Sequence, residues 1–297
     1  MNAGLSLLSF ERWSQFVECG QRRNLITHND GVVSEQYLKM CSKEGYIFTN
    51  PVAVGDKLGL NPSYFLKSCE LMMEVAFKLG QTLWRKIFTN ELSDADDHAI
   101  EVIYEDCLQT ESWDRAIVFT EFIIKQKNLS SDQSRKINTI NLAIALKFSG
   151  KKEQADKVLS SIDWSGSSAD LKLAEAVLSD KFDNAAEIME RFGKQGELIN
   201  EQAYHHFPLF REFRKSEQFS KTYEKIYGYP FTVQLQRNAD KKQAIATKEI
   251  EKQDEEAKLL LEGNASANDL KSKATAPANT LKVSSPTSKK KTLKIIK

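Results

Sequence analysis

Three side chains with the chemistry to act on a phosphodiester lie close together near the start of the chain. They are Arg23, Asn24 and His28, and a turn-forming Asn-Asp-Gly follows them directly. Arginine can hold a phosphate through parallel N–H donors, and histidine can transfer a proton near neutral pH. Because RNA supplies its own nucleophile, the ribose 2′-hydroxyl, this pair is the smallest set that could cleave RNA without a metal. The plainer interpretation is structural: His28 caps the end of its helix and Arg23 is a solvated surface cation.

The elements that must position these residues are helices. Apolar residues at helical spacing predict one amphipathic helix over residues 5–27, with Glu18 on its polar face. A shorter helix is expected over residues 34–43. A long helix should then start at Asn61-Pro62, which is a favourable cap followed by a favourable first residue. Its apolar stripe is predicted to form the core of a bundle and consists of Phe65, Cys69, Met72, Met73, Ala76, Leu79, Gly80, Leu83, Trp84 and Ile87.

Arg-Asn followed by three residues and a His, at a helix end, resembles the signature of HEPN domains, small helical bundles common in prokaryotic defence and toxin systems. The resemblance covers roughly residues 8–90. It implies a dimer in which Arg23 and His28 of both protomers share a cleft. Arg23 would hold the scissile phosphate, Asn24 would orient it and His28 would transfer protons. Only 22 residues precede Arg23, so the domain would be N-terminally shortened. Many HEPN domains bind partners without cutting RNA.

Residues 91–232 alternate short helices with short breaks and show internal similarity. The alanines Ala116, Ala155 and Ala185 are spaced by 39 and 30 residues, which brackets the usual period of about 34 for tetratricopeptide repeats. With a turn predicted at Gly150, this segment resembles a degenerate array of such repeats. The resemblance implies a stack of helix pairs with a concave surface that binds a protein partner.

Two segments follow the predicted array. Alternating charges over residues 233–262 predict an exposed helix. Residues 263–297 carry eight lysines and one aspartate, a net charge of +7, and we expect a disordered basic tail there. Since the whole chain has a net charge of +1, the rest is acidic and suits a high-affinity nucleic-acid surface poorly.

Composition limits the remaining function classes. Only 6 prolines and 13 glycines in 297 residues favour helices over a sheet with many tight turns. We find no phosphate-binding loop, dinucleotide fingerprint, zinc-protease motif or nucleophile elbow, and we expect no cofactor and no metal. Neither a signal peptide nor an apolar run of about 20 residues is present, so we expect no membrane segment. Four widely spaced cysteines without a CxxC pair indicate free thiols in a reducing cytoplasm: Cys19, Cys41, Cys69 and Cys107.

The sequence therefore predicts an all-α protein in which a HEPN-like helical segment, residues 1–90, packs on a short tetratricopeptide-like solenoid, residues 91–232. The leading functional hypothesis is protein recognition through the repeat surface, in a bacterial defence or toxin-type setting. One alternative is a metal-independent endoribonuclease that acts as a homodimer through its N-terminal segment. The other is a regulatory partner of a separate nuclease.

Overall fold

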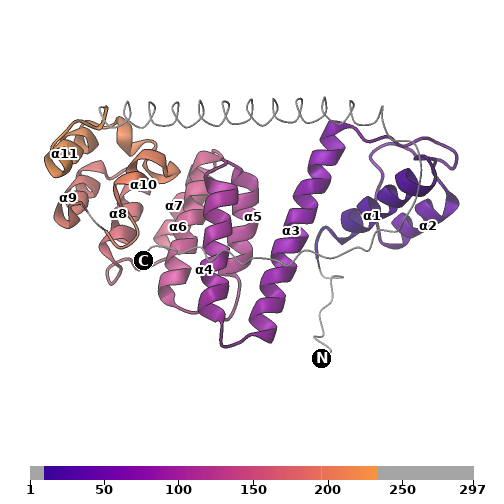
Figure 1. Cartoon of the computed structure of the whole chain (residues 1–297), viewed down its shortest axis with the longest axis horizontal. Helices are drawn as coiled ribbons and strands as arrows, with labels where there is room; N and C mark the ends of the chain where they lie inside the picture. Colours follow the sequence, from indigo (N-terminus) through magenta and orange to yellow (C-terminus); the bar gives the residue numbers. More distant parts are fainter. Residues whose placement is uncertain (1–9, 195, 233–297) are drawn as a thin grey trace, which may run out of the picture. The chain divides into compact units, whose positions relative to one another are not determined.

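The computed structural model describes residues 10–194 and 196–232, and over these ranges the chain is all-α (Figure 1). No strand is present in them, and an isolated antiparallel bridge joins Val32 to Lys57. The segments predicted as a charged helix and a basic tail lie outside the described residues. The elements are α1 (Trp13–His28), α2 (Glu35–Lys43), α3 (Pro62–Ile87), α4 (Leu92–Val102), the π-helix η2 (Ile103–Leu108), α5 (Trp113–Ile124), α6 (Asp132–Phe148), α7 (Lys152–Ser160), α8 (Ala169–Leu178), α9 (Phe182–Phe192), α10 (Glu201–His206), the 3₁₀ turns η3 (Pro208–Phe210) and η4 (Phe213–Lys215), and α11 (Glu217–Tyr227).

Three helical hairpins share one type of turn. In each, a residue two or three positions after the end of the first helix has a left-handed backbone, with φ of 56° at Glu111, 82° at Gly150 and 57° at Asp180. The next backbone N–H then bonds to a carbonyl five residues earlier, which satisfies the open end of the helix. These bonds are Ser112 N to Cys107 O (2.8 Å), Lys151 N to Leu146 O (2.8 Å) and Lys181 N to Ala176 O (2.9 Å).

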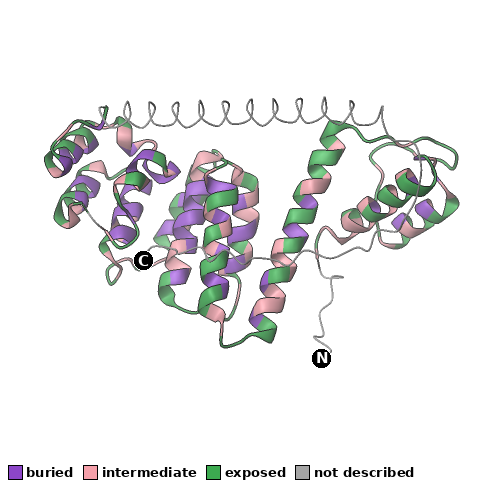
Figure 2. Cartoon of the chain, in the orientation of Figure 1, coloured by how far each residue is buried: buried purple, intermediate pink, exposed green. Residues whose placement is uncertain are grey.

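The predicted alanine positions are confirmed as core positions. Ala116, Ala155 and Ala185 each follow the turn residue of their hairpin by five residues, and all three are buried. A methyl side chain at this point lets the two helices of a hairpin approach closely. One continuous apolar core runs through these hairpins, and Figure 2 shows its buried residues concentrated on α6 and α8.

Aromatic residues extend this core beyond the last hairpin. Phe210 and Phe213 come from the two 3₁₀ turns, Phe219 and Tyr223 come from α11, and all four are fully buried. Their rings contact one another, for example Phe213 and Phe219 at 5.2 Å between centroids. These aromatic rings therefore serve as core residues.

The apolar stripe of α3 is not the bundle core that its periodicity predicts. The helix starts as expected, because the Asn61 side chain accepts a hydrogen bond from Tyr64 N at 2.8 Å. However, Phe65 is 56% exposed and Leu66 is 63% exposed, and Met72 and Met73 are exposed too. The buried face of α3 instead combines apolar Leu71 and Val75 with the polar side chains of Glu74, Gln81 and Arg85.

A buried ion pair explains why α3 turns this polar face inward. Arg85 contacts Asp96 of α4 at 2.6 Å and donates to the carbonyl oxygen of Asn128 at 3.1 Å. Asp96 in turn accepts from the backbone N–H and the hydroxyl of Ser130, at 2.7 and 2.6 Å. These contacts fix α3 against α4 and against the loop that precedes α6.

Candidate binding groove

The three residues singled out from the sequence lie in the last turns of α1. Arg23, Asn24 and His28 are all exposed, and Arg23 Nη1 donates to Asn24 Oδ1 at 3.1 Å. At about 100° per residue, Asn24 and His28 lie on one face of the helix, whereas Arg23 and His28 lie about 140° apart around its axis. Within one chain, the arginine and the histidine therefore do not converge on a common point.

A buried carboxylate positions α1. Glu18 accepts hydrogen bonds from the hydroxyls of Tyr37 (2.7 Å) and Tyr64 (2.9 Å) and from Arg22 Nε (2.7 Å), so one side chain joins α1, α2 and α3. Burial, together with the charge on Glu18, raises the pKa of both tyrosines and keeps their hydroxyls protonated as donors. The prediction that Glu18 faces solvent was wrong, because these three donors offset the cost of removing the carboxylate from water. Helix α1 also begins at Trp13, later than expected.

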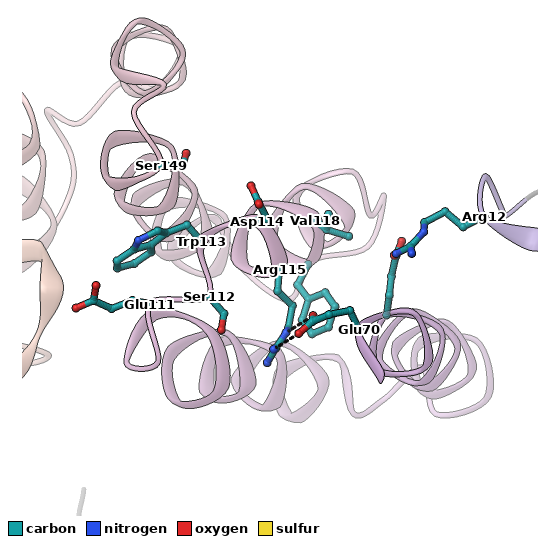
Figure 3. Close-up of a pocket in the computed structure, with 11 residues that line it drawn as sticks. Arg12, Glu70, Glu111, Ser112, Trp113, Asp114, Arg115, Val118 and Ser149 are labelled. Atoms are coloured by element: carbon teal, nitrogen blue, oxygen red, sulfur yellow. Dashed lines mark hydrogen bonds and ion pairs between the residues drawn. The ribbon is translucent and has the colours of Figure 1, made fainter. Parts of the chain in front are cut away.

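A groove of about 600 Å³ opens between α3, the start of α5 and the end of α6. Figure 3 shows Trp113 and Glu111 at one end, Arg12 at the other and Arg115 with Glu70 between them. We call this the Trp113 groove. Its lining residues are Arg12, Glu70, Glu74, Glu111, Ser112, Trp113, Asp114, Arg115, Val118, Phe119 and Ser149.

Both arginines of the groove already have carboxylate partners. Arg12 pairs with Glu74 at 2.8 Å, and Arg115 donates from two nitrogens to Glu70 at 2.6 and 2.8 Å. These hydrogen bonds lower the pKa of Glu70 below its usual range, while burial opposes the shift. Asp114 differs, because its side chain is 94% exposed and its ion pair with Lys151 is long, at 3.8 Å. The groove therefore presents a carboxylate to solvent at Asp114.

Trp113 provides an aromatic surface beside that carboxylate. Its ring is half-buried and lies 5.5 Å from the ring of Phe148 of α6. The guanidinium of Arg211 sits 4.8 Å from the Phe148 ring and 5.8 Å from Trp113, and it pairs with Glu111. A residue far along the chain thus holds one end of the groove, next to the turn of the first hairpin.

The lining residues suit binding. They include carboxylates, guanidinium groups, hydroxyls and an indole, but no histidine or cysteine that could pair as base or nucleophile. In the part of the chain that the structure describes, no group of three or more His, Cys, Asp or Glu side chains is arranged to hold a metal ion. The sequence alone does not reveal this groove, because it identifies Trp113 only as an apolar residue in a helical segment.

Comparison with protein family models, with curated proteins and with solved structures finds no match for this chain. The resemblances to HEPN domains and to tetratricopeptide repeats therefore rest on the residues quoted for them. None of the helices described here is both long enough and apolar enough to cross a bilayer.

Proposed function

We propose that this protein is a helical scaffold that binds a protein partner, and that the Trp113 groove receives a lysine or arginine side chain of that partner. The observation that carries this proposal is the exposed carboxylate of Asp114 beside the half-buried indole of Trp113. The groove's own cations, Arg12 and Arg115, are already paired with carboxylates. Arg211 already lies 5.8 Å from the Trp113 ring and pairs with Glu111, so the exposed carboxylate of Asp114 is the acidic group of this groove that is most open to a cation from outside.

The energies involved are those of partner recognition. A cation over an indole ring contributes about 0.5–1 kcal/mol at an exposed site, and an exposed ion pair contributes about 0.2–1 kcal/mol. One such contact gives weak binding, so a stable complex also needs contacts along the neighbouring helices. The hairpins at residues 91–232 supply a rigid surface for these contacts.

The test is selection from a displayed library of random peptides on the full-length protein, followed by affinity measurements on the selected peptides. Asp114→Lys replaces the attraction between the carboxylate and the peptide's cation by repulsion between two cations. We therefore expect about tenfold weaker binding of the peptide, which corresponds to about 1.4 kcal/mol. Glu153→Lys is the matched control, because Glu153 is exposed at the equivalent position after the turn of the next hairpin. The affinity of the selected peptides for Glu153→Lys should differ less than twofold from their affinity for the wild-type protein. Failure to select any peptide, or equal losses in both variants, would contradict the proposal.

The second candidate function is a metal-independent, HEPN-type ribonuclease. Its support is that Arg23, Asn24 and His28 are all exposed at one end of α1. Because Arg23 and His28 lie on different sides of that helix, a catalytic cleft would need a second copy of the chain. RNA cleavage by the purified protein that disappears in His28→Ala would support this function. Equal cleavage by both proteins, or cleavage by neither, would exclude it.

A further inference from the structure

The exposed face of α3 is apolar along most of the helix. At about 100° per residue, its members fall within a sector of about 120°, while the buried face lies on the opposite side. The stripe spans 23 residues, from Phe65 to Ile87, or about 33 Å of helix. Its exposed members are Phe65, Leu66, Met72, Met73, Ala76, Gly80 and Ile87.

One edge of this stripe borders a second groove, of about 320 Å³, between α3 and the continuous helix α4–η2. We call it the α3 groove. From α3 it is lined by Met73, Ala76, Phe77, Gly80, Gln81 and Trp84, which span three helical turns, or about 16 Å. From the other side it is lined by His98, Val102 and Asp106, at four-residue spacing, and by Arg115 and Phe119 of α5. Arg115 is already paired with Glu70.

The shape of the α3 groove suits a helix. The small residues Ala76 and Gly80 leave space in the middle of the groove, and a Cβ placed on Gly80 would meet no atom within 4 Å. Met73 and Trp84 stand at its two ends on α3. Trp84 is held in place by a hydrogen bond from Nε1 to Glu91 at 3.0 Å and by the ring of His98 at 5.5 Å. An unbranched methionine side chain adapts to different apolar partners.

The opposite rim of the α3 groove is acidic. Residues 90–114 contain nine aspartates and glutamates and no lysine or arginine. The exposed acids of α4 and η2 are Asp94, Asp97, Glu101, Glu105 and Asp106. Burial, together with the carboxylates of Asp96 and Asp94, raises the pKa of Asp97. Glu101 and Glu105 each follow a groove residue by three positions, so they face the same side of the helix.

We propose that the α3 groove binds an amphipathic helix of a partner protein, with lysines or arginines beside its apolar face. The apolar side chains of that helix lie on Met73, Ala76 and Gly80, and its cations face Glu101 and Glu105. This is helix-in-groove recognition with complementary charge. A second copy of this chain fits less well, because the exposed cations of α3 are only Lys67 and Lys86 and both lie off the apolar stripe.

The proposal shares with the preceding one a role in protein binding, and Arg115 and Phe119 line both grooves. The residues that would contact the partner differ, and the proposal has a separate test. Three synthetic 18-residue peptides are titrated into the full-length protein and followed by fluorescence anisotropy. The first has leucines on one helical face and lysines elsewhere, the second has glutamates in place of the lysines, and the third is a scramble of the first. We expect the basic amphipathic peptide to bind at least tenfold more tightly than the other two.

Variants then locate the binding site. Met73→Asp and the double variant Glu101→Lys/Glu105→Lys should each weaken binding of the basic peptide at least tenfold. The matched controls are Ile47→Asp, at an apolar residue 87% exposed outside the groove, and Glu187→Lys on α9, and each should change binding less than twofold. Asp114→Lys should also leave this peptide's affinity unchanged, which separates the α3 groove from the Trp113 groove.

Three results would overturn the proposal. The first is equal binding of the acidic and basic peptides. The second is binding that Met73→Asp leaves unchanged while thermal melting shows the variant to be folded. The third is a concentration-dependent dimer of the wild-type chain that Met73→Asp abolishes, because this would assign the apolar face to a second copy.

Discussion

Replacing Asp96 by alanine should remove a large part of the stability of this protein. Asp96 is fully buried and Arg85 is 6% exposed, so the variant leaves a guanidinium inside the protein without its counter-ion. Removal of one partner of a buried ion pair costs about 3–5 kcal/mol. The variant also leaves Ser130 N–H without its acceptor, so we expect the upper part of that range.

Urea unfolding followed by circular dichroism measures this loss as a shift of the midpoint at constant slope. A domain is typically stable by about 5–15 kcal/mol, so a loss of about 4–5 kcal/mol removes between about a third and nearly all of its stability at 25 °C. Asp132→Ala is the control. Asp132 is 73% exposed in an i,i+4 pair with Lys136, and its loss should cost less than about 0.5 kcal/mol.

A double-mutant cycle separates the ion pair from other effects of the substitution. The single variants Arg85→Met and Asp96→Leu should each be strongly destabilising, whereas the double variant should recover much of the loss, because it leaves no charge unpaired. A loss below about 1 kcal/mol for Asp96→Ala, or simple additivity in the cycle, would refute the argument that this pair holds α3 in place.

Three further predictions test other parts of the structure. Gly150→Ala should lower the free energy of unfolding by about 1 kcal/mol in thermal or urea unfolding, because a Cβ there meets open space but the φ of +82° strains an alanine. Gly166→Ala, where a Cβ also meets open space, should cost less than about half of that. Gly196→Ala should lower the free energy of unfolding by about 2 kcal/mol. Its Cβ would overlap the carboxylate of Asp170, which accepts hydrogen bonds from the backbone N–H groups of the three residues after Gly196. An unchanged unfolding midpoint would contradict this prediction. Burial lowers the pKa of His205 below its value in the unfolded chain. The contribution of the neutral imidazole to stability should therefore be complete above about pH 6.5 and should be lost as the pH decreases below that value. If a His205→Gln protein shows the same pH dependence, another group is responsible.

The repeated hairpins are the part of the fold that sequence predicts best. Helical spacing around Ala116, Ala155 and Ala185, and a glycine at position 150, are local signals that close packing and turn geometry impose directly. The equivalent turns at Glu111 and Asp180 could not be recognised, because a left-handed conformation is uncommon for residues other than glycine.

The buried charges are the part that sequence could not predict. Glu18 and Asp96 look like surface residues, since most of their partners lie far along the chain. Tyr37, Tyr64 and Ser130 are 19 to 46 positions away, and only Arg22 and Arg85 are nearer. Periodicity identified an apolar face on α3 correctly, but it could not show whether another helix of the chain covers that face. For the same reason, Trp113 was recognisable as an apolar residue and not as the wall of a groove.

A charge-swap experiment tests the role in protein binding most directly. A peptide selected on the Trp113 groove is made with its key lysine or arginine replaced by glutamate, and both peptides are measured against the wild-type protein and Asp114→Lys. If Asp114 meets a partner's cation, each single change weakens binding about tenfold and the two changes together restore most of the affinity. If the swapped pair binds no better than either single change, the carboxylate and the cation do not meet, and the proposed role of the Trp113 groove is wrong.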